Sequence, residues 1–247
     1  MTGMIETFLI AAIPVVIAIT LHEAAHGYAA WAMGDPTAKE AGRLSLNPLA
    51  HVDRVGTILL PGFLLLSQLA TVGHVAFMFG WAKPVPVSAW RFRDPRRGMM
   101  FVAAAGPLMN FFLAWLGAVA LHLLPILATT RDGAELQLQF VSVFIIANLA
   151  LGLFNLLPIP PLDGGRIVVG LLPLPAARAW ARVERAGILI VLLILFLLPA
   201  ALREFGYNYD PVREYLGIAI LHVSRLILWL AGSSPFLPFI FGDGSDL

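Results

Sequence analysis

Residues 8–26 read FLIAAIPVVIAITLHEAAH, an apolar run that passes directly into the motif His22-Glu23-x-x-His26. On a helix, side chains at positions i and i+4 lie on one face, so the two imidazoles can bind the same metal ion. A carboxylate beside the first imidazole can exchange a proton with a water that the metal activates. Ionisable side chains at membrane depth are costly and usually functional. The stretch therefore predicts a membrane helix that carries part of a metal site.

The composition of the chain is that of a membrane protein. Of its 247 residues, 59% are hydrophobic and 13% are charged, and the mean hydropathy is +0.84. A soluble domain has about a quarter of its residues charged. The formal net charge is +1 and no basic run is interleaved with aromatic residues, so we expect no nucleic-acid partner. The lack of cysteine excludes disulfides and thiolate metal ligands.

Apolar segments recur along the whole chain. Five of them are long enough to cross a hydrocarbon core about 30 Å thick: Phe8–Met33, Met99–Leu127, Leu138–Leu157, Gly187–Leu202 and Tyr215–Ala231. The first lacks the basic flank and the cleavage site of a signal peptide, so we expect it to remain as a helix. A sixth stretch, Gly56–Gly80, is interrupted by Pro61-Gly62. We therefore expect an all-α polytopic membrane protein, with about six membrane-embedded segments in a single domain, residues 1–247.

Basic residues flank the sixth stretch on both sides. Three precede it and five follow it: Lys39, Arg43 and Arg54, then Lys83, Arg91, Arg93, Arg96 and Arg97. Because loops rich in Lys and Arg stay in the cytoplasm, both ends of Gly56–Gly80 should lie on that side. A single span cannot achieve this, whereas a re-entrant stretch turning near Pro61-Gly62 can. We expect a multi-pass protein of the cell membrane.

A catalytic zinc site needs a third protein ligand and one open position. The candidates are the carboxylates near membrane segments and four histidines, His51, His74, His122 and His222. Asp163 stands out because three prolines must end the helix before it, and two glycines after it let the backbone turn or approach closely. Irregular backbone at membrane depth survives only where protein or a water cavity covers it. The alternative is that Asp163 caps a helix that starts near Gly165.

Four motifs together resemble the site-2 protease family of intramembrane zinc metalloproteases. They are His22-Glu23-x-x-His26, GWAKPVPV at 80–87, AGPLMN at 105–110 and NLLPIPPLDG at 155–164. The likeness covers most of 21–166. It implies that His22, His26 and Asp163 bind one Zn²⁺ ion and that Glu23 is the catalytic acid and base. No PDZ-like or CBS-type domain is visible, so we expect a short form of the family.

The same resemblance suggests roles for two further parts of the chain. It implies a small β element near the active site, which we expect in Gly73–Phe79 and Trp81–Val87, with an edge for an extended substrate strand. The alternative is a loop that seals the cavity. Asn155 is expected to stabilise the oxyanion or to position the substrate, and its alternative role is a helix-packing amide. We expect Asn110 and Asn148 to be packing residues.

The proposed ligand set imposes a condition on the topology. If Gly56–Gly80 spanned the membrane, Asp163 would lie on the face opposite His26, and the two could not share a metal at about 2 Å. A re-entrant stretch places both on the cytoplasmic side. The charge distribution and the metal geometry therefore require the same fold-back.

The sequence thus predicts an intramembrane zinc endopeptidase, which hydrolyses a peptide bond within or near a transmembrane segment of a substrate protein. Its expected partners are that substrate and the lipid bilayer, and nothing indicates an oligomeric state. The alternative is a non-proteolytic metal-binding membrane transporter or chaperone-like relative, but a transporter would favour polar residues along several segments or a repeat symmetry. A prenyl-protein zinc endopeptidase would need a downstream Glu ligand in place of Asp163.

Overall fold

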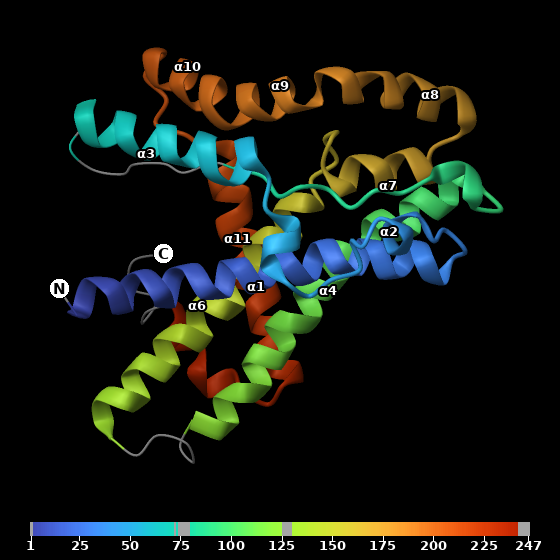
Figure 1. Ribbon diagram of the computed structural model, residues 1–247. Coiled ribbons are helices and arrows are strands. Elements are labelled where there is room, and N and C mark those ends of the chain that lie inside the picture. The colour runs from blue at the N-terminus through green and yellow to red at the C-terminus, as the bar shows by residue number, and fades with distance from the viewer. Residues whose placement is uncertain (1, 72, 74–79, 125–129, 242–247) are drawn as a thin grey trace.

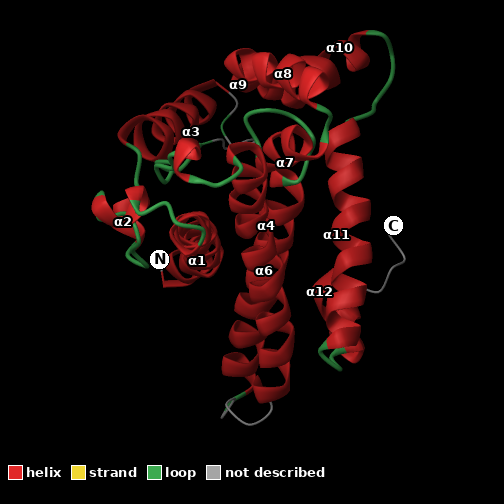
Figure 2. Cartoon of the chain, turned by 90° about the vertical axis from the view of Figure 1, so that its right-hand side faces the viewer, coloured by secondary structure: helices red, strands yellow, loops and turns green. Residues whose placement is uncertain are grey.

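The computed structural model describes residues 2–71, 73, 80–124 and 130–241, and within these ranges the regular structure is entirely helical (Figure 1). Four long helices dominate: α1 (Thr2–Ala32), α4 (Pro95–Ala120), α6 (Arg131–Asn155) and α11 (Pro211–Leu230). Figure 2 shows α4, α6 and α11 running side by side, with α1 seen end-on next to them. Helix α1 thus crosses the α4–α6 pair, and the contacts of α1 with both helices lie at this crossing.

Shorter helices connect and cover this framework. They are α2 (Thr37–Glu40), α3 (Leu60–Thr71), α7 (Asp163–Leu171), α8 (Leu174–Val183), α9 (Gly187–Leu192), α10 (Leu198–Glu204) and α12 (Leu237–Phe241). Short 3₁₀ turns occupy Pro48–His51, Ala89–Arg91, Leu121–Leu123, Glu184–Ala186 and Ser234–Phe236, and π-helical turns occupy Arg54–Leu59 and Leu193–Leu197. The run from α8 to α10 lies across one end of the α4, α6 and α11 helices, on the same side as α3 and α7 (Figures 1 and 2).

In the part of the chain that the structure describes, five helices are long and apolar enough to cross a membrane. They are Phe8–Ala32, Arg54–Thr71, Pro95–Leu123, Gly133–Asn155 and Gly187–Glu204. Four of them match predicted spans, and the fifth, Arg54–Thr71, overlaps the predicted re-entrant stretch Gly56–Gly80. The predicted span at Tyr215–Ala231 forms α11, but this helix carries Arg213, Glu214 and Arg225 and is therefore not in the apolar set.

The apolar core lies between α4, α6 and α11. Small residues on α4, Ala114 and Ala118, are completely buried and let α6 approach closely, where Ile145 and Leu149 are also completely buried. Leu228 of α11 packs into the same cluster. Helices packed in lipid rely on such close contact because lipid tails are as apolar as the side chains. The closely packed α4–α6 pair therefore supports the residues that lie where α1 crosses it.

The two ends of the predicted re-entrant stretch meet in the structure. The backbone N–H of Trp81 donates to the carbonyl oxygen of Gly56 at 3.2 Å. A Cβ atom on Gly80 would lie 2.4 Å from the same oxygen, so only glycine permits this approach. A helix that crossed the membrane once would separate its ends by about 30 Å. The chain thus leaves and returns at one place, as the fold-back requires.

The turn is not where the sequence suggested it. Pro61-Gly62 does not interrupt the chain, which is helical from Arg54 to Thr71 because a π-helical turn leads directly into α3. Pro61 falls in the first turn of α3, where a residue without an N–H is tolerated. The predicted turn at Pro61-Gly62 is therefore wrong.

The predicted β element is not seen in its second half. Residues 80–88 form a loop without strand pairing, and Pro84 and Pro86 remove two of the donors that a strand ladder would need. Of the first half, Gly73–Phe79, residues 74–79 lie outside the described part of the chain.

Candidate metal centre and active site

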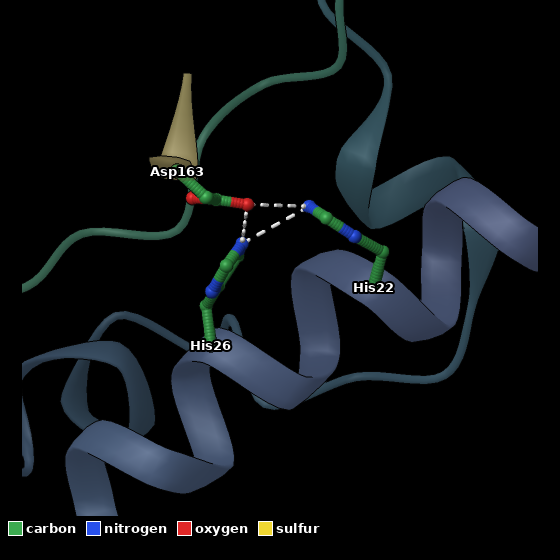
Figure 3. A group of neighbouring side chains, drawn as sticks. All are labelled: His22, His26 and Asp163. Atoms are coloured by element: carbon green, nitrogen blue, oxygen red, sulfur yellow. Dashed lines mark hydrogen bonds and ion pairs between the residues drawn. The ribbon is translucent and has the colours of Figure 1, made fainter. Parts of the chain in front are cut away.

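The motif histidines lie on one face of α1, as their spacing predicts. Their Nε2 atoms are 3.1 Å apart, and the two rings stand nearly perpendicular to each other (Figure 3). His22 is 5% exposed, so it is withdrawn from both lipid and water. This face of α1 is the one that meets α4 and α7.

Asp163 reaches the histidines from the first residue of α7. Its Oδ2 atom lies 3.2 Å from Nε2 of His22 and 3.3 Å from Nε2 of His26 (Figure 3). Leu162, and not Asp163, occupies the N-cap position of α7, and no side chain makes a cap hydrogen bond there. The alternative role of Asp163 as a helix cap is therefore wrong. Its carboxylate points at the imidazoles instead.

The two glycines after Asp163 allow this placement. A Cβ atom on Gly164 would lie 2.3 Å from the carbonyl oxygens of Leu156 and Leu157, and one on Gly165 would lie 2.6 Å from the nitrogen of Pro160. The loop that follows α6 therefore packs directly on the first turn of α7. Any larger residue at either position would push α7, and Asp163 with it, away from α1.

Each histidine is oriented by a hydrogen bond from its other ring nitrogen. Nδ1 of His26 lies 2.7 Å from the carbonyl oxygen of Val102, and Nδ1 of His22 lies 2.6 Å from Oδ1 of Asn110, both on α4. The amide of Asn110 in turn donates to Oδ1 of Asn148 on α6 at 3.0 Å. A carbonyl can only accept, so each Nδ1 carries the proton, and each Nε2 of a neutral ring is a bare lone pair.

The convergence of these atoms fits a zinc ion. Three electron-pair donors, two Nε2 atoms and one carboxylate oxygen, lie 3.1–3.3 Å apart, and Oδ2 of Asp163 is buried without a hydrogen-bond partner. Bare lone pairs this close repel unless a cation lies among them. Tetrahedral zinc with bonds of about 2.0–2.1 Å separates its ligands by about 3.3 Å. Among the described residues, these three form the one cluster of its kind.

Gly106 of α4 lies directly behind the two imidazoles of the candidate metal centre. A Cβ atom there would lie 2.6 Å from Cε1 of His22 and 2.5 Å from Cε1 of His26. The imidazoles thus rest against bare backbone. The stretch 105–110 carries a family likeness and its small residues are typical of helix packing, but nothing in its spacing predicts that Gly106 touches the histidines.

Glu23 and Asn155 share a cavity of about 230 Å³ with His22. The Oε2 atom of Glu23 accepts a hydrogen bond from the backbone N–H of Val85 at 3.2 Å, so the loop 80–88 holds the carboxylate. Asn155 ends α6, and its amide donates to the carbonyl oxygen of Leu151 at 3.0 Å. The structure thus brings Asn155 to the cavity wall but not into contact with the three clustered side chains.

The other candidate third ligands lie elsewhere. Nε2 of His51 is hydrogen-bonded to the carbonyl oxygen of Ser45, and Nε2 of His122 is hydrogen-bonded to the carbonyl oxygen of Ala231. His222 belongs to no cluster of metal-binding side chains among the described residues, and His74 lies outside them.

Comparison with known proteins identifies the kind of protein. The chain is 41% identical over 192 residues to a Bacillus subtilis protein named "Putative zinc metalloprotease YwhC", covering 76% of this chain and 80% of the relative. The profile of peptidase family M50 matches residues 125–198, a range that includes Asn155 and Asp163. The chain belongs to the site-2 protease family, peptidase family M50.

A second relative supports the same conclusion. A Mycobacterium tuberculosis protein named "Putative zinc metalloprotease Rip2" is 32% identical over 186 residues, which are 74% of this chain and 64% of Rip2. No solved structure matches the chain. As a member of this family, the protein is a membrane zinc metalloprotease with Zn²⁺ as its cofactor, and the transporter alternative is not favoured.

Sequence reasoning missed the supporting residues of this M50 protease. Asn110 and Asn148 were expected to be packing residues, but they form a hydrogen-bonded chain that ends on His22. Both are completely buried. A buried amide on an apolar helix needs a partner, and this could have signalled their role before the partner was known.

Proposed function

We propose that this protein is an intramembrane endopeptidase, which cleaves a transmembrane segment of another protein with one zinc ion bound by His22, His26 and Asp163. The observation that carries the proposal is the meeting of two Nε2 atoms and one carboxylate oxygen within 3.3 Å, on side chains from α1 and α7. Helix α1 is apolar enough to cross a membrane, so the cluster belongs to the membrane part of the chain.

In this proposal Glu23 moves the protons of the reaction. A zinc ion polarises the scissile carbonyl and acidifies water near it. Glu23 lines the same cavity as His22, and there it takes a proton from the attacking water and returns it to the leaving amine. Asn155, on the wall of that cavity, hydrogen-bonds to the substrate carbonyl or backbone. Asn110 and the carbonyl of Val102 keep both imidazoles in the tautomer that leaves Nε2 free.

The loop 80–88 is proposed to receive the substrate. Its backbone passes beside Glu23, where Val85 already donates to the carboxylate, and it carries no strand pairing of its own. An unwound substrate segment that lies along this loop brings its scissile bond toward the cluster. We place this site on the cytoplasmic side of the cell membrane, because basic residues gather at both ends of Gly56–Gly80 and those ends meet.

Replacing Glu23 tests the chemical role. We predict that Glu23→Gln binds one zinc per chain but cleaves a model transmembrane substrate at least about 10²-fold more slowly, because the proton acceptor is lost. The measurement pairs metal analysis with a cleavage assay on purified protein in vesicles. The matched control is Glu204→Gln, at an exposed position near the end of α10. Normal cleavage by a zinc-loaded Glu23→Gln protein would refute the proposed role.

A further inference from the structure

A second cavity lies beside the proposed active site, between α1 and the loops around it. Its volume is about 300 Å³. Its wall is formed mainly by apolar residues: Val16, Ile19, Pro48, Val52, Pro61 and Trp81. An apolar cavity of about 150 Å³ is already large enough to bind benzene. The space therefore suits an apolar side chain as large as leucine or phenylalanine.

Two polar side chains in this wall hydrogen-bond to the protein itself, whereas Nδ1 of His51 is buried without a hydrogen-bond partner. Oγ1 of Thr57 donates to the carbonyl oxygen of Trp81 at 2.9 Å, and Nε2 of His51 pairs with the carbonyl oxygen of Ser45 at 2.8 Å. These contacts leave the cavity with a largely apolar lining. Such a pocket favours an apolar ligand, since a charged group would lose its hydration without gaining partners.

The cavity adjoins the one that Glu23 and Asn155 line. Four residues line both: Ile19, Gly80, Trp81 and Ala82. Trp81 stands at the boundary, and its ring lies flat against Gly56, where a Cβ atom would be 2.4 Å from the indole. A group in the second cavity is therefore separated from the proposed reaction site only by Trp81 and its neighbours.

We infer that this second cavity is a specificity pocket, which receives the large apolar side chain of a substrate residue adjoining the scissile bond. The inference rests on the proposed function and adds to it a selection among cleavage sites. A peptide whose backbone lies along the loop 80–88 passes Trp81 and Ala82 next to Glu23. A side chain pointing away from Glu23 then enters the second cavity. The pocket selects leucine, methionine or phenylalanine over alanine or charged residues at that position.

Two neighbouring valines on α1 provide a matched test. Val16 lines the pocket and Val15 lines none of the cavities described above, yet they are 43% and 42% exposed. The full-length protein in vesicles is assayed with transmembrane peptides that carry alanine, leucine or phenylalanine on each side of the mapped cleavage site. Changes of one methylene in an apolar pocket alter selectivity by about 10–200-fold. Val16→Phe should therefore lower kcat/KM for leucine and phenylalanine substrates by about tenfold or more.

The control variants define what supports the pocket and what overturns it. Alanine substrates should be cleaved by Val16→Phe within about twofold of the wild-type rate, and Val15→Phe should retain the wild-type preference. Val16→Ala, which enlarges the pocket without risk of a clash, should shift the preference toward phenylalanine. An equal loss for all three substrates, as expected if a lipid chain fills the cavity, would overturn the inference. So would unchanged selectivity in both Val16 variants.

The same assay separates failure of the pocket from failure of the proposed function. If the wild-type protein cleaves the peptides in a zinc-dependent way without preference at either position, only the pocket is refuted. If no peptide is cleaved by zinc-loaded wild-type protein, the proposed intramembrane endopeptidase is refuted as well.

Discussion

Gly106 shows at the residue scale how closely the metal centre is packed. Its missing side chain leaves room for both imidazoles, since a Cβ atom would lie within 2.6 Å of each ring. Protein interiors resist such overlap, and the rings are fixed from behind by Asn110 and Val102. A single methyl group at this position must therefore displace an imidazole.

We predict that Gly106→Ala weakens zinc binding by about 10- to 100-fold, the range seen when outer-shell contacts of metal sites are changed. Competition with a calibrated chelator measures the affinity. Gly217→Ala is the matched control, because Gly217 also lies on a long helix, α11, and a Cβ atom there meets nothing within 4 Å. Wild-type affinity in Gly106→Ala would show that the imidazoles do not rest on this residue.

The clustered side chains of the site were predictable from sequence, but their supports were not. Helical spacing predicted that His22 and His26 share a face, and the prolines and glycines around Asp163 marked it as the third candidate. The structure brings these three side chains together. The contact of Gly106 with the imidazoles depends on how α4 crosses α1, and no local pattern encodes a crossing. The same holds for Asn110, whose partner is 88 residues away in the chain.

At the element scale, the loop 80–88 is held between two carboxylates. Glu23 accepts from the N–H of Val85, and Asp35 accepts from the N–H of Ser88 at 2.6 Å. Asp35 is completely buried and also accepts from the N–H and hydroxyl of Thr37. Burial raises the pKa of Asp35, but these hydrogen bonds and nearby Arg91 outweigh it and leave the pKa below its usual range. The loop is thus anchored by an ionised carboxylate.

This anchor predicts a pH-dependent stability. Because the folded-state pKa of Asp35 is lowered, its stabilisation is fully present above the unfolded-state pKa of about 3.9 and is lost as pH falls through the folded value. Asp35→Asn should lower the free energy of unfolding by about 1–3 kcal/mol at pH 7, since a charged acceptor is lost.

Thermal unfolding of both proteins between pH 7 and pH 3 checks this prediction. The difference between wild type and Asp35→Asn should be largest at pH 7 and should shrink below about pH 3.9. A difference that grows as the pH falls would contradict the assigned role of Asp35.

Helices were easier to predict than their interruptions. Length and hydropathy predicted the long apolar helices, because a membrane requires both. The prediction of a turn at Pro61-Gly62 was wrong, because Pro61 lies in the first turn of α3 and proline does not break a helix there. The strand at Trp81–Val87 was not formed, because the same prolines that end a sheet also prevent this short run from pairing.

At the scale of the whole molecule, we propose that both ends of Gly56–Gly80 lie on one side of the membrane, because the backbones of Gly56 and Trp81 are in contact. Their backbone contact places α2 and the start of α4 near the same end of the structure. If this end faces the cytoplasm, the loops before and after Gly56–Gly80 are exposed on one side. The opposite side is then marked by the beginning of α6, at the far end of the α4–α6 pair (Figure 1), where Thr130 is the N-cap residue.

Single cysteines test this arrangement, since the chain has none of its own. We predict that Ala41→Cys and Arg93→Cys, both at exposed positions, react with a membrane-impermeant maleimide from the same side of sealed vesicles. Thr130→Cys should react from the other side. Labelling of Ala41→Cys and Arg93→Cys from opposite faces would mean that Gly56–Gly80 spans the membrane.

The most direct measurement is the zinc content of Asp163→Ala compared with the wild type and with the exposed-site control Glu204→Ala. We claim that side chains of α1 and α7 bind the same zinc ion, although these helices are far apart in the sequence. Metal analysis after dialysis against a weak chelator should give about one zinc per chain for the wild type and the control, and far less for Asp163→Ala. Full zinc occupancy in Asp163→Ala would contradict the claim.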